Sequence, residues 1–393
     1  MNTGKTIFAQ LMEFISHHQF NTCVRRYNGH YKVLHFTCWE QFLCMSFAQL
    51  SYRESLRDIE VCLRSNEKKI YHLGIRSRIS RSTIAYANEK RDWRIYRDLG
   101  YVLIERATAL YANENFAVSL KNITYALDST TIDLCASLFP WACYCKTMAS
   151  VKMHTLLNLR GNIPSVVIIT DAFVSELKVL DQLLIETGAV YILDRGYIDY
   201  ARLYNIHKNH AFFVTRARSD FDFQRLYSQK VNKEQGIQCD QTGLLHNYRS
   251  RKLFPDKLRR IKYFDKETNK QLIFFTNNMS LSAITITDLY RSRWQIELFF
   301  KWIKQHLRIK AFFGRSENAV KTQIWIAVCT YVLVAIVKKE LRIQLSLYNI
   351  LQILSVSLFE KTLILQQLSE SNYKNYNNLT QLPLFSDDVM FGQ

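Results

Sequence analysis

Residues 122–139 read NITYALDSTTIDLCASLF, and at this stretch the sequence changes from helical to extended patterning. Asp128 and Ser129 are turn-type residues between two apolar, β-prone runs, and a third such run follows closely. Three strands in succession predict an antiparallel meander. The expected strands are Ile123–Leu127, Ile132–Phe139 and Ala149–Leu159.

Strand and helix signals then alternate along the chain. Strands are expected at 166–170, 189–193 and 211–215, with helices near 177–185 and 198–207. A meander followed by strand-helix units predicts a mixed sheet with helices on its faces. This is an α/β chain (an α+β mixed sheet), and the order matches an RNase H-like core.

The flanking regions have other patterns. The first hundred residues carry helical spacing, and the capping box formed by Thr37 and Glu40 predicts a helix start. Charged, β-prone pieces from about 217 to 276 predict a β-rich insertion. Later spacing predicts three helices, and the tail from Ser369 is rich in Asn, Ser, Gln and Tyr, which indicates poor order. The helices are expected at 287–307, 320–341 and 345–368.

The charge balance indicates an anionic partner. Lys and Arg number 52 against 34 Asp and Glu, a formal charge of +18. Nucleic acid is the first candidate partner and an anionic membrane the second. The longest apolar run, Trp325–Val337, is too short to span a bilayer and is read as a buried helix. A basic stretch, Arg76–Arg97, fits either a helix in a DNA groove or a solvated charged face.

Three aspartates follow predicted strands and are candidates for chemistry. Asp128 and Asp194 each come directly after an apolar run, with Gly196 permitting a tight exit after the second. An Asp in this position also commonly starts a turn or caps a helix. Asp171, after the strand at 166–170, competes for a role by the same logic, and spacing alone does not eliminate it.

A helix further along combines one acid with several bases. Its polar residues recur at helical spacing and fall within one narrow arc, beside an apolar packing face. The same pattern also fits an exposed helix with (i, i+4) ion pairs. The arc holds Tyr290, Arg293, Glu297, Lys301 and Lys304, and the packing face holds Leu289, Ile296, Phe299, Phe300 and Ile303.

Charge connects these residues to phosphodiester chemistry. Cutting a phosphodiester requires stabilisation of negative charge, which two Mg²⁺ ions about 4 Å apart supply. Clustered carboxylates hold such ions, and water and substrate phosphate complete the octahedron. Arg293 and Lys304 then contact phosphates beside the scissile bond.

The spacing Tyr290-x2-Arg293-x3-Glu297-x6-Lys304 resembles the YREK signature of the DDE transposases of the insertion sequence four group. The segments around Asp194 and Asp128 are similar to those around the group's two aspartates. The resemblance implies that Asp128, Asp194 and Glu297 are metal ligands for two Mg²⁺ ions, with Mn²⁺ as a substitute. DNA contacts are expected from Tyr290, Arg293, Lys304, Lys301 and Arg195.

The resemblance also implies cut-and-paste transposition through a DNA hairpin, with transposon-end DNA and target DNA as partners. It implies a homodimer and a bacterial cytoplasmic, nucleoid-associated location, and the lack of a spanning apolar run predicts no membrane partner. In the group an aromatic residue of the insertion stacks on a flipped base. This insertion has no Trp between 217 and 276, so Tyr248, Phe254 or Tyr263 is expected in that role.

Five segments are therefore expected. They are a helical DNA-binding domain (1–110), the first part of the core (111–216), the insertion (217–280), the second part of the core with the catalytic helix (281–342), and a C-terminal helix with a disordered tail (343–393). The competing functions are a structure-specific RNase H-like nuclease without strand transfer and an inactive DNA-binding derivative.

Overall fold

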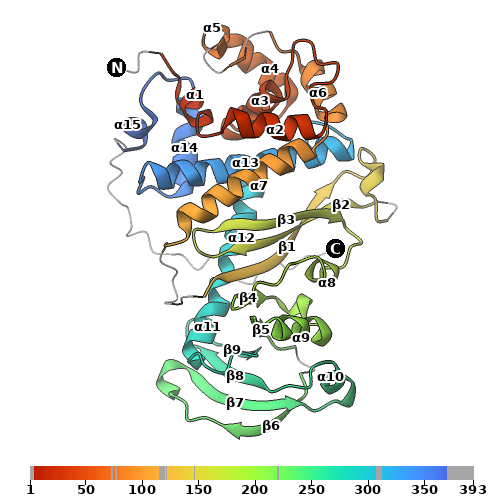
Figure 1. The fold of residues 1–393 in the computed structure, drawn as a ribbon, viewed down its shortest axis with the longest axis vertical. Coiled ribbons are helices and arrows are strands. Elements are labelled where there is room, and N and C mark those ends of the chain that lie inside the picture. Colours follow the sequence, from red (N-terminus) through yellow and green to blue (C-terminus); the bar gives the residue numbers. More distant parts are fainter. Residues whose placement is uncertain are drawn as a thin grey trace.

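The computed structural model describes residues 4–71, 74–75, 78–114, 120, 122–145, 147–218, 221–306 and 312–369. Figure 1 shows a sheet that runs from the middle of the molecule to its lower end, with a thick helical layer above it. The strands are β1 (Thr124–Leu134), β2 (Ala149–Asn158), β3 (Ile163–Asp171), β4 (Val190–Leu193), β5 (Phe212–Arg216), β6 (Phe223–Ser228), β7 (Ile237–Leu245), β8 (Leu258–Asp265) and β9 (Lys270–Thr276).

The sheet is mixed, as expected. Its order among the described strands is β3-β2-β1-β4-β5-β9-β8-β7-β6. The strands β1, β2 and β3 form an antiparallel meander, whereas β4 and β5 run parallel to β1. This order and these directions over β3 to β5 are those of an RNase H-like core.

The first predicted strand boundary is wrong. The expected strand Ile123–Leu127 and the start of the expected strand Ile132–Phe139 are one continuous strand, β1, which ends at Leu134, and Asp128 lies inside it opposite Thr155 of β2. The long β2 pairs with β1 from Tyr125 to Leu134, and this pairing overrides the turn preference of Asp128 and Ser129. The meander therefore takes β3 as its third strand.

The insertion is β-rich, as predicted, and it extends the core sheet. Its strand β9 pairs with β5 through Val214 and Thr276, so β6 to β9 continue the same sheet. A buried ion pair, Arg259 with Asp240 (2.7 Å), joins β8 to β7. Arg259 also donates to the carbonyl of Leu281, directly before α11. This arginine therefore links the insertion to the start of the candidate catalytic helix.

Helices cover both faces of the sheet and form the upper layer in Figure 1. They are α1 (Ile7–Met12), α2 (His17–Arg26), α3 (Cys38–Leu50), α4 (Leu56–Ser65), α5 (Glu67–Ile70), α6 (Arg81–Lys90), α7 (Arg94–Tyr111), α8 (Leu177–Leu180), α9 (Tyr200–Lys208), α10 (Tyr248–Leu253), α11 (Ala283–Ser292), α12 (Trp294–Lys301), α13 (Glu317–Glu340), α14 (Leu347–Ser357) and α15 (Ile364–Ser369).

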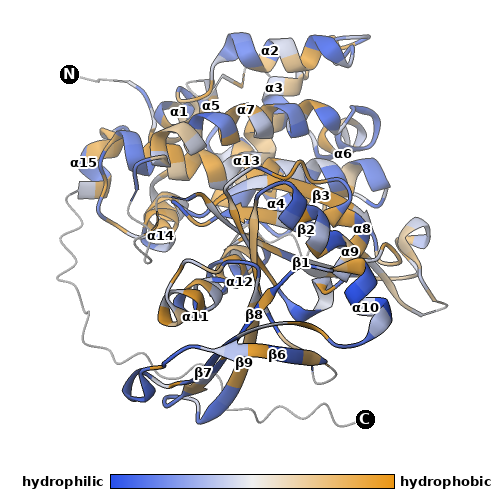
Figure 2. Ribbon diagram, turned by 60° about the horizontal axis from the view of Figure 1, so that its bottom comes forward, coloured by the Kyte–Doolittle hydropathy of each residue, from blue (hydrophilic) through white to orange (hydrophobic). Residues whose placement is uncertain are grey.

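The helix α13 is the centre of the upper layer. It contains the apolar run 325–337 and packs against α3, α6, α7 and α14, where Figure 2 shows hydrophobic colouring. By length and composition it is apolar enough to cross a membrane, yet 94% of its apolar window is buried inside the protein. The predicted buried helix is confirmed. One apolar cluster runs continuously from α1 through the meander to α15.

Several predicted helices differ in extent. The capping box of Thr37 and Glu40 is confirmed at the start of α3. The helix expected at 177–185 shrinks to the four residues of α8. The helix expected at 345–368 is broken between α14 and α15, because the carbonyls of Leu358 and Glu360 accept the first N–H groups of α1. The tail after Ser369 lies outside the described residues.

The basic stretch Arg76–Arg97 is divided between α6 and the start of α7, and Arg76 lies outside the described residues. Arg91 donates to the backbone carbonyls of Phe36 and Thr37, which commits its guanidinium to the protein interior. Arg94 pairs with Asp92. A single basic helix lying in a DNA groove is therefore not what this stretch forms.

Replacing Asp240 by Asn should destabilise the protein by about 3–5 kcal/mol, because it leaves the Arg259 guanidinium buried without its counter-ion. Chemical denaturation measures this loss. The control is Asp181→Asn, which breaks a half-exposed pair with Arg202 and should cost less than about 1 kcal/mol. Similar losses in both variants would contradict the structural role of the buried pair.

Candidate active site

Two adjacent parallel strands set the platform of the site. The parallel pairing of β1 with β4 ends at Leu127 and Leu193. Asp194 directly follows β4, and Asp128 is the next residue along β1, which continues to Leu134. Both aspartates therefore lie at the C-terminal end of this parallel pairing, the end of parallel strands at which α/β proteins bind ligands. Gly196 does not adopt a left-handed backbone conformation. The prediction that a glycine is needed here for a tight backbone turn after the strand is therefore wrong.

The predicted long helix 287–307 is two helices followed by a π-helical turn. The helix α11 begins earlier, at Ala283, the break falls at Arg293, and the π-helical turn spans Trp302–His306. Leu307 lies outside the described residues. Interruptions of this kind are frequent at functional sites. The predicted packing face is confirmed, because all its members are buried: Leu289, Ile296, Phe299, Phe300 and Ile303.

The helix pair brings its polar residues onto the two aspartates. Arg293 donates through Nη1 to Asp128 Oδ2 (2.7 Å) and through Nη2 to Glu297 Oε1 (2.6 Å). The Tyr290 hydroxyl donates to Asp194 Oδ1 (3.3 Å). Residues from three separate parts of the sequence therefore meet at one place.

The electrostatics of the site show that its carboxylates influence one another. The pKa of Asp128 is raised to about 6, mainly by burial and to a smaller extent by the negative charges of Asp194 and Glu297, while Arg293 and the Ser129 N–H oppose the rise. Burial also raises the pKa of Tyr290 to about 12. Tyr290 is thus a neutral hydrogen-bond donor at physiological pH.

The residues fit a divalent cation in their chemistry. Three carboxylates supply the oxygen ligands that Mg²⁺ prefers. No group of three or more Asp, Glu, His or Cys in the described part of the chain is arranged to hold a metal ion directly, and Arg293 instead lies between Asp128 and Glu297. A metal ion therefore requires that the guanidinium move away.

The other predicted residues lie around this cluster. Lys304 lies in the π-helical turn and donates to the carbonyl of Thr131 on β1 (2.6 Å). Lys301 and Arg195 are exposed. Asp171 on β3 pairs with Val151 of β2, and Val151 pairs in turn with Ile132 of β1. Ile132 lies four residues beyond Asp128 on the same strand. Strand geometry therefore puts Asp171 roughly 15 Å from Asp128, outside the cluster.

Sequence reasoning missed four residues beside the site. Ser129 was noted only as a turn-type residue, and Tyr197, three residues after Asp194, is of a type that indicates no particular role. Arg216 ends β5, and its charge acts on Tyr290. Glu176 lies after β3 and accepts a hydrogen bond from Ser129 (2.6 Å). The available sequence signal for Glu176 was that it is an acidic residue shortly after the strand predicted at 166–170.

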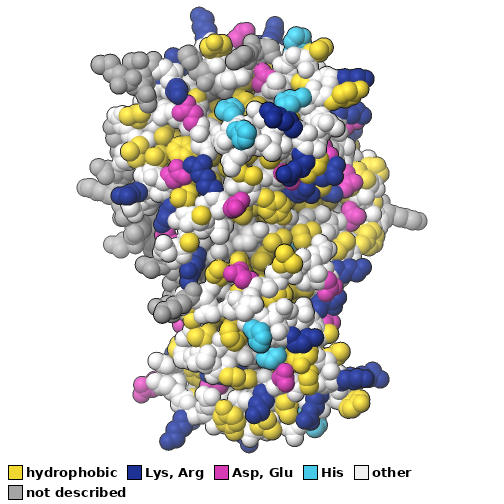
Figure 3. All heavy atoms as spheres, viewed as in Figure 1, with side chains coloured by type: hydrophobic (Ala, Val, Ile, Leu, Met, Phe, Trp, Pro, Cys, Tyr) yellow, Lys and Arg dark blue, Asp and Glu magenta, His cyan; other side chains and the backbone are white. Residues whose placement is uncertain are grey.

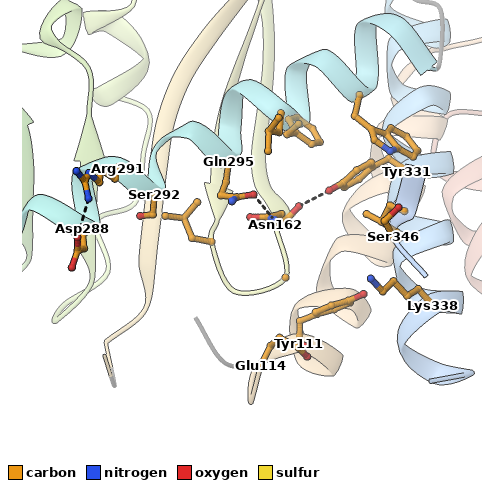
Figure 4. A pocket seen from close by; sticks show the side chains of 16 residues that line it. Tyr111, Glu114, Asn162, Asp288, Arg291, Ser292, Gln295, Tyr331, Lys338 and Ser346 are labelled. Carbon is orange, nitrogen blue, oxygen red and sulfur yellow. Dashed lines mark hydrogen bonds and ion pairs between the residues drawn. The ribbon is translucent and has the colours of Figure 1, made fainter. Parts of the chain in front are cut away.

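A cavity beside the same helices is a separate feature. It has a volume of about 840 Å³ and lies on the other side of α11 and α12, where it includes Asp288, Arg291 and Gln295. Figure 4 shows Gln295 against Asn162, and Asn162 against Tyr331. None of the three site carboxylates lines this cavity.

The fold and the site together define a class: an RNase H-like core with two strand-borne aspartates and a helix-borne glutamate. The family model described as "Transposase DDE domain" matches residues 120–333, which is more than half of the chain. The chain belongs to this family, and a DDE domain implies dependence on divalent metal ions. A model described as a domain of unknown function matches residues 3–76.

Curated relatives agree with this assignment. "Putative transposase y4zB" of Sinorhizobium fredii is 34% identical over 241 residues, 60% of this chain and 66% of that protein. "Probable transposase for insertion sequence element IS5377" of Geobacillus stearothermophilus is 28% identical over 244 residues, 60% of this chain and 64% of that protein. The chain thus spans slightly less than two thirds of each relative.

A solved structure, the piggyBac transposase synaptic complex with hairpin DNA, aligns with 99% of this chain and 88% of its own. The TM-score is 0.46 and the sequence identity 10%. A likeness at this level supports no conclusion about this protein.

The raised pKa of Asp128 predicts a pH-dependent stability in chelator. The folded protein holds the Asp128 proton up to about pH 6, whereas the unfolded chain releases it near 3.8. The stability contributed by this group is complete below 3.8 and is lost as the pH rises to about 6. Relative to wild type, Asp128→Asn should therefore gain melting temperature over this range and level off above it. A constant difference between pH 4 and pH 7 would contradict the burial of an ionisable Asp128.

Proposed function

We propose that this protein is a DNA transposase of the insertion sequence four group, which cuts and joins DNA strands at the ends of an insertion sequence. One observation carries the proposal. Arg293 donates hydrogen bonds to both Asp128 and Glu297, and Tyr290 donates one to Asp194, so these contacts bring the three carboxylates into one cluster. Membership of the transposase DDE domain family supports it. The expected location is the bacterial cytoplasm, at the nucleoid.

The three carboxylates are the proposed ligands of two Mg²⁺ ions, with Mn²⁺ as a substitute. Such ions would activate the attacking oxygen and stabilise charge on the phosphate and the leaving oxygen. Asp128 must be ionised to serve, which its pKa of about 6 allows at neutral pH. The clustering of carboxylate oxygens supports this donor chemistry, and the positive charge of Arg293 beside Asp128 and Glu297 balances part of their negative charge.

Arg293 has two alternative sets of partners in this proposal. In the structure it pairs with Asp128 and Glu297. Cations held by those carboxylates would balance their charge and would free the guanidinium for a phosphate of the transposon end, for which its bidentate geometry is suited. Tyr290, Lys304, Lys301 and Arg195 are the other proposed contacts to this strand.

The insertion offers a wider surface for DNA. Figure 3 shows Lys and Arg side chains over the lower end of the molecule, which is the end formed by β6 to β8 and α10. Among the aromatics expected to stack on a flipped base, Phe254 and Tyr263 are buried, whereas Tyr248 is 80% exposed. Tyr248 is therefore the proposed stacking residue. The exposed lysine and arginine residues of the insertion are Arg225, Lys230, Lys233, Arg249, Arg251, Lys252, Lys257, Lys266 and Lys270.

The proposed reaction follows the cut-and-paste course. Hydrolysis frees a 3′-hydroxyl, this hydroxyl attacks the opposite strand to give a hairpin, the hairpin opens, and the end joins target DNA. A homodimer would hold the two ends together. Each step needs the same charge stabilisation at one phosphate, which one set of carboxylates provides.

Substitution of the carboxylates tests the chemistry. Full-length protein, Mg²⁺ and a duplex carrying the inverted repeat that flanks the coding sequence should give nicked and hairpin products on a denaturing gel. Asp128→Asn, Asp194→Asn and Glu297→Gln should each reduce product at least a hundredfold, because each removes a metal ligand. The matched control, Asp171→Asn, should cleave normally.

The products also separate the competing functions. Ca²⁺ in place of Mg²⁺ should retain DNA binding and suppress cleavage. Cleavage of structured DNA without strand transfer would indicate the nuclease, and binding without any cleavage would indicate the inactive derivative. Undiminished cleavage in chelator would exclude the metal mechanism.

Substitution of Arg293 tests the proposed phosphate contact. Arg293→Ala should weaken binding to the same duplex and reduce the slope of log affinity against log salt by about one, since one phosphate contact is lost. Fluorescence anisotropy in Ca²⁺ at several salt concentrations measures both quantities. Arg202→Ala, which removes a partly exposed arginine paired with Asp181, is the control. An unchanged slope in Arg293→Ala would remove the phosphate contact from the proposal.

A further inference from the structure

A fourth carboxylate, Glu176, lies between the segments that carry Asp128 and Asp194. Its Oε1 accepts a hydrogen bond from the Ser129 hydroxyl (2.6 Å), and the Ser129 N–H donates to Asp128 Oδ1 (2.8 Å). Its Oε2 lies only 2.9 Å from the point that a Cβ on Gly196 would occupy. The absence of a side chain at Gly196 therefore leaves the room that Glu176 fills.

A buried donor faces the same cluster. Tyr197 has no exposed surface, and its hydroxyl lies near the Ser129 side chain without a well-formed hydrogen bond to any described residue. Burial raises its pKa well above the usual range, and the charges of Glu176, Asp128 and Asp194 add to the rise. The hydroxyl therefore stays protonated among three carboxylates. A buried donor of this kind usually has a ligand or an ordered water as its partner.

The neighbouring histidine does not neutralise Glu176. His154 is opposite Ser129 on β2, and its Nε2 shares a hydrogen bond with Thr170 (3.0 Å). Burial lowers its pKa to about 4, so its ring is neutral at physiological pH. The Glu176 carboxylate thus retains its capacity to accept a hydrogen bond beyond the one from Ser129.

We propose that Glu176 is a positioning residue of the metal site: it accepts a hydrogen bond from a water ligand of the ion that Asp128 and Asp194 hold. The Tyr197 hydroxyl is the donor available to the same water network. Mg²⁺ keeps several waters in protein sites, and the groups that hold such ligands tune metal affinity. This inference rests on the proposed function, because it needs a cation between the two aspartates.

Metal binding without DNA tests the inference. Mn²⁺ is titrated into the full chain by isothermal calorimetry, and free Mn²⁺ is checked by electron paramagnetic resonance. Glu176→Gln should weaken Mn²⁺ binding about tenfold, with the metal-free melting temperature close to that of wild type. Tyr197→Phe should weaken it by a smaller factor.

Two further variants control for side-chain chemistry and for folding. Glu186 also accepts a hydrogen bond from a hydroxyl, that of Tyr125 (2.8 Å), so Glu186→Gln makes the same chemical change on the surface and should leave Mn²⁺ affinity unchanged. Gly196→Ala displaces the Glu176 carboxylate without removing it. This variant should also weaken Mn²⁺ binding severalfold, and it provides the test if Glu176→Gln does not fold.

The outcomes separate this inference from the proposed function. Unchanged Mn²⁺ affinity in Glu176→Gln, alongside lost affinity in Asp128→Asn, overturns the role of Glu176 alone. A lower melting temperature with unchanged affinity also overturns that role, because it indicates a purely structural contribution. Absence of Mn²⁺ binding in wild type overturns both the metal site and this inference.

Discussion

The pairing of Arg293 with both Asp128 and Glu297 is the interaction on which the site depends. The three side chains come from a strand and a helix separated by more than 150 residues, and one guanidinium satisfies both carboxylates. Without that charge the two partly buried acids would repel each other beside Asp194. The arginine therefore keeps Asp128 and Glu297 close to each other.

The sequence predicted the mixed sheet because its strand signals were locally strong. It placed Asp194 correctly after β4 and identified the buried face of the catalytic helix from periodicity alone. It misjudged Asp128, since the residue types Asp and Ser favour a turn, while pairing along the full length of β2 is a property of the whole sheet. Likewise, the break between α14 and α15 depends on backbone partners in α1, which no local window contains.

The carboxylate ligands were predicted through a spacing signature, but the environment of those ligands was not. Glu176 becomes a neighbour of Ser129 only through the path of the chain after β3, and Gly196 is small because that neighbour needs the space. The distance of Asp171 from the cluster also follows from strand register, which composition does not reveal. Contacts across elements were thus the part that sequence patterns left undetermined.

The burial of α13 among the N-terminal helices affects how forces travel through the molecule. Because α13 touches α3, α6 and α7, and the apolar interior continues from them into β1 to β3, the first hundred residues are not a freely swivelling attachment. A load applied to those helices by a bound macromolecule would be transmitted through close-packed side chains to the sheet. The helical layer and the sheet are therefore expected to move together as one closely packed body.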